Sequence, residues 1–267
     1  MPSEAEVYAH TPRSSVNRLK QRATYDHEKI HSIIDSAPVL HVSFNPTSFE
    51  DDPFPTILPM LGCTGSFTSS GAQEKSAVVI YLHGHSASRF MKIPSQPPSY
   101  LEEVTLPGIP VCVAATHIDG LVLAYTPFNH SCNYRSAVVH GYASAVEEPE
   151  EKTYALQLIT DNMLSERWDN SRVPPTEAEM KSTGVIRVDI VSASAKIRAY
   201  GVGNGQPDLD NEQMRKGVWT GYGEPVSAEE NLVGTVPTYI GDWIKGHNDE
   251  AEKYSKQITS LKAPKKS

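Results

Sequence analysis

Several segments of the chain alternate between hydrophobic and polar residues or form short apolar runs, and both patterns predict strands. These segments are residues 39–44, 54–61, 77–82, 134–146 and 184–191. Residues 110–117 and 121–125 are expected to form a hairpin, because the Asp119-Gly120 dipeptide between them favours a tight turn. Pro55 and Pro59 predict that strand 54–61 lies at an edge or carries a bulge.

A spacing of three and four residues predicts helices elsewhere. Isoleucines at this spacing give residues 24–37 one apolar face, and Thr24 or Asp26 can cap the first turn. Further helices are expected at residues 149–164, after the capping box at 176–179, and at residues 238–261. Loops or irregular structure are expected at residues 1–15, which form a loose arm, and at 63–75, 93–108 and 201–236.

Strands outnumber helices in this reading, and their connections are short hairpins more often than helical crossovers. The predicted fold is therefore mainly β with flanking helices (α+β), built as a single antiparallel barrel or sandwich. A Rossmann sheet fits poorly, because no GxGxxG segment follows a strand.

The composition narrows the class of partner. The 267 residues carry a formal net charge of -8, which argues against general binding of nucleic acid or of an acidic membrane surface. Cys63, Cys112 and Cys132 form no CxxC pair, so no zinc site is predicted. No apolar stretch has the length of a secretory leader or a membrane span. A cytoplasmic protein with no membrane partner is expected.

The stretch YLHGHSASRFMK, residues 81–92, holds the first candidate chemistry. Ser86, Ser88, Arg89 and Lys92 follow directly after a predicted strand, where a helical turn can begin. Free backbone N–H groups, hydroxyls and cations at such a place suit a phosphate. The alternative is a solvated turn with ordinary surface charges.

Two further clusters carry polar and cationic side chains. In FNHSCNYRSAVVHG, residues 128–141, the polar residues before the apolar strand could hold a heteroaromatic ring or a second anion, or simply form a polar loop. Ser194–Arg198 adds two cations, which could instead protect an edge strand from aggregation. No HExxH and no GxSxG segment is present, so neither a metal site nor a serine hydrolase is predicted.

Several of these stretches, in order along the chain, resemble the flavin-nucleotide-binding branch of the pyridoxamine 5'-phosphate oxidase-like family, to which nitroimidazole-resistance proteins belong. The resemblance runs from about Arg18 to Tyr200. The stretches are Arg22–Asp26, Tyr81–Arg89, Gly108–Ala124, Asn133–Ser136, Arg167–Asp169 with Pro174–Thr176, and the SAKxR segment within Ser192–Arg198.

The resemblance implies an FMN-binding split β-barrel that forms a homodimer with FMN at each subunit interface. It implies that Ser86, Ser88, Arg89 and Lys92 bind the FMN phosphate. The other implied cofactor-binding residues are Thr56, Ile57 and Leu58 against the isoalloxazine, His83 at the ring or substrate side, and Tyr134, Arg135 and Ser136 from a later strand of the same or the partner subunit.

The expected organisation is an arm at residues 1–17, the FMN-binding barrel domain at 18–200, and a C-terminal extension at 201–267. The extension is expected to pack on the barrel or on the dimer partner. The expected function is that of an FMN-dependent oxidoreductase acting on a small molecule, with His83 as the candidate substrate-facing residue. The alternatives are a flavin-binding carrier or sensor without turnover, and a haem-binding split barrel with His83, His117 or His130 as ligand.

Overall fold

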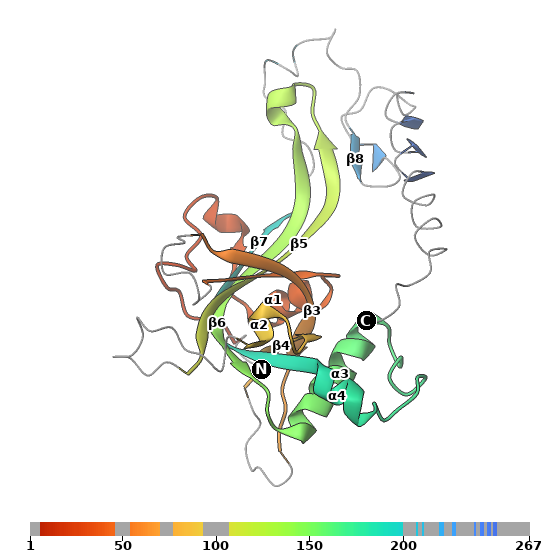
Figure 1. Ribbon diagram of the computed structural model, residues 1–267. Coiled ribbons are helices and arrows are strands. Elements are labelled where there is room, and N and C mark those ends of the chain that lie inside the picture. Colours follow the sequence, from red (N-terminus) through yellow and green to blue (C-terminus); the bar gives the residue numbers. More distant parts are fainter. Residues whose placement is uncertain are drawn as a thin grey trace, which may run out of the picture. The chain divides into compact units, whose positions relative to one another are not determined.

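The computed structural model describes residues 6–45, 54–69, 77–92 and 107–199, together with short stretches beyond residue 206 (Figure 1). Its contacts divide the chain into two compact units. The first unit comprises residues 1–117 and 135–197, and the second comprises residues 118–134 and 198–267. The expected boundary at residue 200 stays a prediction.

Six antiparallel strands close into a barrel. They are β2 (Leu40–Phe44), β3 (Thr56–Gly65), β4 (Val79–His85), β5 (Ile109–Leu123), β6 (Ser131–Ala145) and β7 (Thr183–Arg198). The sheet runs β7-β4-β3-β2-β5, and β6 pairs with both β5 and β7, so the two ends of the sheet meet. The short strand β1 (Ala23–Thr24) pairs with the far end of β7. Of the two architectures left open by the sequence, the barrel is confirmed.

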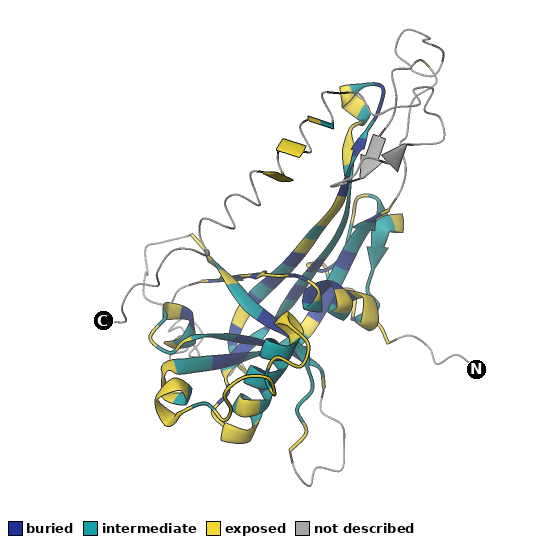
Figure 2. Ribbon diagram, turned by 90° about the vertical axis from the view of Figure 1, so that its right-hand side faces the viewer, coloured by how far each residue is buried: buried dark blue, intermediate teal, exposed yellow. Residues whose placement is uncertain are grey.

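The inside of the barrel is filled by apolar side chains from alternate strand positions. In β2, for example, Leu40, Val42 and Phe44 are buried, whereas His41 and Ser43 between them face outward. The same alternation runs along β5 and β6, where buried and less buried positions follow one another (Figure 2). Because successive residues of a strand point to opposite faces, this pattern fixes which side chains reach the outer surface.

Helix α1 (His27–Asp35) closes one end of this core, as the isoleucine spacing predicted. Ile30, Ile33 and Ile34 are buried, and the Asp26 carboxylate caps the helix by accepting a hydrogen bond from the Lys29 backbone N–H. At the other end of α1, the Asp35 carboxylate accepts hydrogen bonds from the backbone N–H and the hydroxyl of Thr64 on β3, at 2.7 and 2.8 Å. These bonds fix α1 to the barrel wall.

Helix α3 (Pro149–Met163) covers the outer face of β3 and β4. Its Ala155 and Ile159 are buried in a second apolar cluster with Cys63 and Tyr81. The Tyr81 hydroxyl donates to the Glu151 carboxylate at 2.8 Å, and that carboxylate also accepts from Arg187. Because both faces of β4 are covered, this strand has a continuous apolar sequence instead of an alternating one.

The helix predicted to start at the capping box of residues 176–179 is also confirmed. Helix α4 (Glu177–Ser182) begins with a capping box in which Thr176 and Glu179 each bond the other's backbone N–H. Two short 3-10 turns, η1 (Lys20–Arg22) and η4 (Pro127–Asn129), and helix α2 (Arg89–Lys92) complete the helices described up to residue 199. Within the described ranges, no helix combines the length and apolar character needed to cross a membrane.

Residues 1–15 were expected to form a loose arm, but the described part of this segment, residues 6–15, is packed against the barrel domain. Val7 forms a β-bridge with Asp26, and the buried Tyr8 hydrogen-bonds through its hydroxyl to Nε2 of His31, at 2.6 Å. The His10 and Tyr25 rings stack at 3.6 Å. The sequence contains too few aliphatic residues here to predict a packed segment, because the contacts are made by aromatic and imidazole rings.

The strand boundaries needed four corrections. No hairpin forms at 119–120, because β5 continues through these residues and turns only at 124–130. Strand β3 extends into the predicted loop as far as Gly65, and β4 extends past Leu82 to His85. Strand β7 includes the cationic segment 194–198, where Lys196 is paired with Ala23. In each case a neighbouring strand supplies hydrogen bonds that the local sequence does not reveal.

Pro59 lies within β3, which has neighbours on both sides in the barrel. It is tolerated because the pairing is divided along the strand: residues 56–60 pair with β2, and residues 61–65 pair with β4. Pro59 therefore lies in the half of β3 that is paired on one side only, and the expectation of a local edge is correct for that half.

In the second unit, the end of β5 pairs with β8 (Trp219–Gly221), which pairs with β9 (Val226–Ser227). The Ala124 backbone N–H donates to Nδ1 of His130 at 3.0 Å, and Arg198 donates to the side-chain oxygen of Asn133. The loop predicted at 93–108, apart from residues 107 and 108, lies outside the described residues. So does most of the helix predicted at 238–261.

Candidate functional site

The turn that follows β4 and the helix α2 after it contain the four residues that were predicted to bind a phosphate. Ser86 and Ser88 are half-buried in this turn, and Arg89 and Lys92 are exposed on α2. Between these two cations lies Phe90, which is fully buried and packs against the Phe44 ring of β2 with 4.7 Å between the ring centroids. This aromatic contact fixes α2 at the end of the barrel.

The backbone N–H groups of Ser86, Ala87 and Ser88, which the sequence suggested would be free, already have hydrogen-bond partners. The Ser86 N–H donates to the Ser182 carbonyl and the Ser88 N–H to the His85 carbonyl, both at 2.8 Å. The Ala87 N–H donates to Nδ1 of His85 at 3.1 Å. An anion at this turn would therefore be bound mainly by the hydroxyls and the two cationic side chains.

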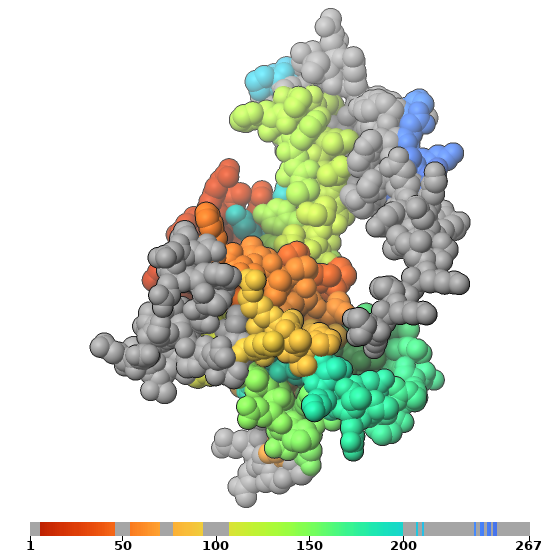
Figure 3. Space-filling model, viewed as in Figure 1, coloured from red at the N-terminus to blue at the C-terminus, as the bar shows by residue number. Residues whose placement is uncertain are grey.

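The structure brings the β3 residues Thr56, Ile57 and Leu58 to the same end of the barrel. Thr56 pairs with Phe44, the residue on which Phe90 of α2 packs. Figure 3 shows residues 54–69 in orange beside residues 77–92 in yellow on one face of the first unit. Ile57 is 59% exposed and contributes apolar surface to this face.

His83 lies one strand away, opposite Leu61 on β3 and Val185 on β7. Its side chain is partly buried, and burial lowers the pKa of the imidazole. The ring is therefore neutral near neutral pH, with one nitrogen able to donate a hydrogen bond and the other able to accept one. This suits a residue facing a ligand, and it equally suits a structural histidine.

Arg135 and Ser136 do not join this group within one chain. The Ser136 hydroxyl donates to the carbonyl of Lys196 on β7, whereas His83 pairs with Val185 at the other end of β7. These two β7 positions are eleven residues apart in the sequence, which corresponds to about 35 Å of strand. Tyr134 belongs to the second unit.

Two of the candidate haem ligands already have hydrogen-bond partners. Nε2 of His117 lies 3.2 Å from the Ser36 hydroxyl and 3.1 Å from the Ile33 carbonyl. Nδ1 of His130 accepts a hydrogen bond from the Ala124 N–H, so only Nε2 of that ring could bind iron. No cluster of three or more metal-ligating side chains occurs in the described part of the chain.

One cluster has no counterpart in the sequence prediction. Arg13, Cys112 and His140 line a hollow on the outer face of the first unit. The alternation of β5 and β6 places Cys112 and His140 outward, so their direction could have been predicted. The approach of Arg13 could not, because it depends on the packed path of residues 6–15.

Comparison with known proteins identifies the fold family. Residues 26–197 match the model of a family described as pyridoxamine 5'-phosphate oxidase. The chain belongs to this family. The match spans more than half of the chain and confirms the resemblance seen in its sequence. A comparison with curated proteins gave no match.

Two solved structures of similar fold align with most of this member of the pyridoxamine 5'-phosphate oxidase family. The flavocytochrome Anf3 from Azotobacter vinelandii is 24% identical, with 85% of this chain and 89% of that chain covered and a TM-score of 0.57. An FAD and heme binding protein from Mycobacterium smegmatis is 22% identical, with 83% and 96% covered and a TM-score of 0.54. At these identities the likeness establishes the fold.

The lowered pKa of His83 predicts how stability depends on pH. The His83 imidazole takes up a proton at higher pH in the unfolded chain than in the folded protein. The neutral ring therefore makes its full contribution to the free energy of unfolding above the unfolded pKa, and this contribution is lost as the pH falls through the folded pKa. We expect His83→Gln to reduce the loss of unfolding free energy between pH 7.5 and 5.5, by at most about 1.4 kcal/mol per pH unit. Urea denaturation at each pH measures this loss.

His41→Gln is the matched control, because the His41 side chain is exposed on β2. It should leave the pH dependence as in the wild type. An unchanged pH dependence in His83→Gln would show that the His83 ring is not buried from solvent in the folded protein.

Proposed function

We propose that the chain binds FMN on the outside of the barrel, where the start of β3 meets α2. The packing of Phe90 on Phe44 is the observation that carries this proposal, because it brings the cations Arg89 and Lys92 to the first residues of β3. Membership of the pyridoxamine 5'-phosphate oxidase family supports a flavin cofactor. The descriptions of the aligned structures, as a flavocytochrome and an FAD and heme binding protein, agree with a flavin.

The residues present fit both halves of FMN. Two cations and two hydroxyls suit a phosphate dianion. The ring needs an apolar surface and a few backbone contacts, and the first half of β3 offers both. Ile57 presents an exposed apolar side chain. Alternate residues of Thr56–Leu58 point their backbone N–H and C=O groups away from β2. On that side β4 pairs with β3 only from Leu61 onward, so these groups can contact the ring.

The proposed activity is that of an oxidoreductase acting on a small molecule. A bound flavin supplies the hydride or electron transfer, and the protein supplies binding and orientation. In this proposal the α2 cations hold the phosphate, the start of β3 orients the ring, and the neutral imidazole of His83 offers a hydrogen bond on the substrate side. Steady-state oxidation of a reduced nicotinamide with a small acceptor separates this activity from that of a non-catalytic flavin carrier or sensor.

A haem-binding role is the second candidate. The partly buried, neutral imidazole of His83 favours it, because iron binds the neutral ring. Among the three predicted ligands, His117 is the least suited, since its Nε2 is already engaged. A Soret band that appears on haem titration and is lost in His83→Gln would support this role.

The phosphate site is tested by comparing FMN with riboflavin, which lacks the phosphate. We expect Arg89→Ala and Lys92→Ala each to weaken FMN binding by about ten- to hundredfold, because each removes a charge-assisted contact of about 1.5–3 kcal/mol. Riboflavin binding should stay within twofold. Quenching of flavin fluorescence measures both affinities.

Lys29→Ala serves as the control, since Lys29 is an exposed cation on α1. It should leave both affinities unchanged. Equal effects of the α2 variants on FMN and riboflavin would place the phosphate elsewhere, and no binding of either flavin would reject the proposed function.

We further propose that the functional form is a homodimer. An extended FMN is much shorter than the stretch of β7 that separates His83 from the Ser136 contact, so Arg135 and Ser136 would contact the flavin bound by a second copy. The exposed Ile57, on the outer face of the barrel, provides apolar surface for such a contact.

We expect light scattering of the wild type to give twice the 29.3 kDa mass of one chain. Ile57→Asp should shift the protein toward the monomer, because a buried unpaired carboxylate opposes association. Val173→Asp, which changes an apolar residue exposed in the loop after α3, should leave the dimer intact. A monomeric wild type would contradict the proposal.

A further inference from the structure

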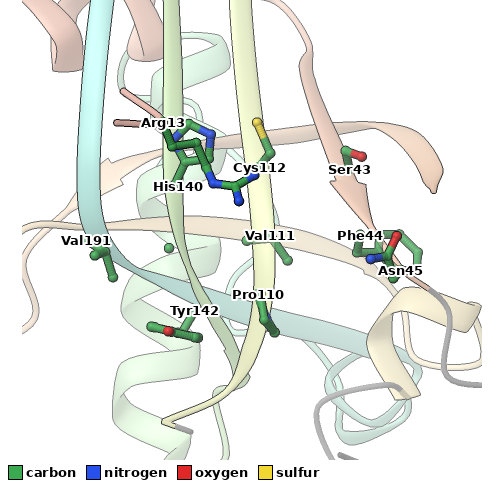
Figure 4. A pocket seen from close by; sticks show the side chains of 11 residues that line it. Arg13, Ser43, Phe44, Asn45, Pro110, Val111, Cys112, His140, Tyr142 and Val191 are labelled. Atoms are coloured by element: carbon green, nitrogen blue, oxygen red, sulfur yellow. The ribbon is translucent and has the colours of Figure 1, made fainter. Parts of the chain in front are cut away.

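The barrel face that α3 leaves uncovered carries a hollow of about 450 Å³ (Figure 4). Its polar lining comes from β2, β5 and β6 and from the packed N-terminal segment. The residues are Arg13, Ser43, Asn45, Cys112, His140 and Tyr142. Pro110 and Val191 add apolar surface. The volume lies within the range of small-molecule sites, and the mixed lining is typical of them.

The described lining of this hollow carries a positive charge and no negative charge. Arg13 is its only permanently charged lining residue, and no aspartate or glutamate is among the lining residues of the described chain. A neighbouring hollow of about 690 Å³ shares Arg13, His140 and Val191, and it also has no acidic lining residue. Figure 4 shows the Arg13 guanidinium between the His140 ring and Cys112. A guanidinium without a facing carboxylate favours an anion at this place.

His140 lacks a partner for one buried nitrogen. Its Nδ1 is shielded from solvent and makes no hydrogen bond within the part of the chain that the structure describes. Leaving such a group unsatisfied costs about 1–3 kcal/mol. Burial, and then the positive charge of Arg13, lower the pKa of His140, so the ring is neutral at neutral pH and can donate one N–H to an acceptor.

Arg13 is held in place by its own turn. The backbone N–H of Thr11 donates to the Ser14 hydroxyl at 3.0 Å, and the Ser14 N–H donates to the Thr11 hydroxyl at 3.1 Å. Ser14 is buried, with 2% of its surface exposed. Because this turn is already ordered, little backbone entropy is lost when the Arg13 guanidinium binds a ligand.

We propose that this hollow binds the anionic group, carboxylate or phosphate, of a small organic molecule, with Arg13 and His140 as its binding residues. The guanidinium offers paired N–H donors that match two oxygens of either group. The neutral imidazole of His140 supplies a further N–H donor, and Tyr142 with Val191 provides a surface for an apolar body. This site is distinct from the α2 turn, and it stands whether or not a flavin is bound there.

The test uses benzoate and phenyl phosphate as probes, with benzyl alcohol as the uncharged comparison, on the full chain. Calorimetry gives the affinities, and the imidazole NMR signals of His140 report its titration. We expect at least one anion to bind, and benzyl alcohol to bind at least tenfold more weakly. The bound anion should raise the pKa of His140, because a nearby negative charge favours the imidazolium.

Arg13→Gln should weaken binding of the anion at least tenfold, and His140→Phe should weaken it severalfold. Arg18→Gln is the matched control, because Arg18 is an exposed arginine further along the same segment and lines neither hollow. It should leave the affinity within twofold. Equal binding of the three probes, or equal affinities in Arg13→Gln and Arg18→Gln, would overturn the proposal.

Titration with FMN separates this site from the proposed flavin site. If the two sites are distinct, Arg13→Gln weakens the binding of benzoate or phenyl phosphate and leaves FMN binding within twofold, whereas Arg89→Ala has the opposite effect. If Arg13→Gln weakens FMN and Arg89→Ala does not, the anion site is supported, and the placement of the FMN phosphate at α2 is overturned.

Discussion

Closure of the barrel through β7 is the constraint on which the rest of the structure depends. This strand pairs with β4 over Thr183–Asp189, with β6, and with β1 at its far end. Two glycines allow close packing along the closed sheet, since a Cβ on Gly141 would lie 2.3 Å from the Asp189 carbonyl and one on Gly62 would lie 2.4 Å from that of Tyr81. Without β7 the sheet would have two open edges and an exposed apolar face.

Closure also decides where ligands can bind. The described residues buried inside the barrel are mostly apolar, so the polar groups that could bind a ligand lie mainly on the outer surface and at the barrel ends. Helix α3 covers the outer face of β3 and β4 with Ala155 and Ile159, which leaves the outer faces of β2, β5, β6 and the start of β3. The exposed Ile57, the α2 turn and the Arg13 hollow all lie on or beside this uncovered surface.

The elements that the sequence predicted well are those defined by local chemistry. The isoleucine spacing and the Asp26 cap define α1, and the Thr176–Glu179 capping box starts α4. The errors arose where a distant strand decides the outcome. Asp119-Gly120 favours a turn by itself, yet β5 continues through it, since its last residues pair with Trp219–Gly221. Periodicity describes one segment at a time and contains no information about its partner.

The candidate site shows the same division between local and distant information. The resemblance implied that Ser86, Ser88, Arg89 and Lys92 bind the same flavin as Thr56–Leu58. The structure brings the two segments to one end of the barrel through Phe44 and Phe90. The Arg13–His140 cluster could not be predicted, because it needs the packed arm. Ser43 connects the two regions, since it pairs with Ile57 on one side and with Cys112 on the other. If both proposals hold, a flavin ring on β3 and an organic anion in the hollow would occupy neighbouring strands of one face, which is the arrangement a flavin enzyme needs to bring a substrate to its cofactor.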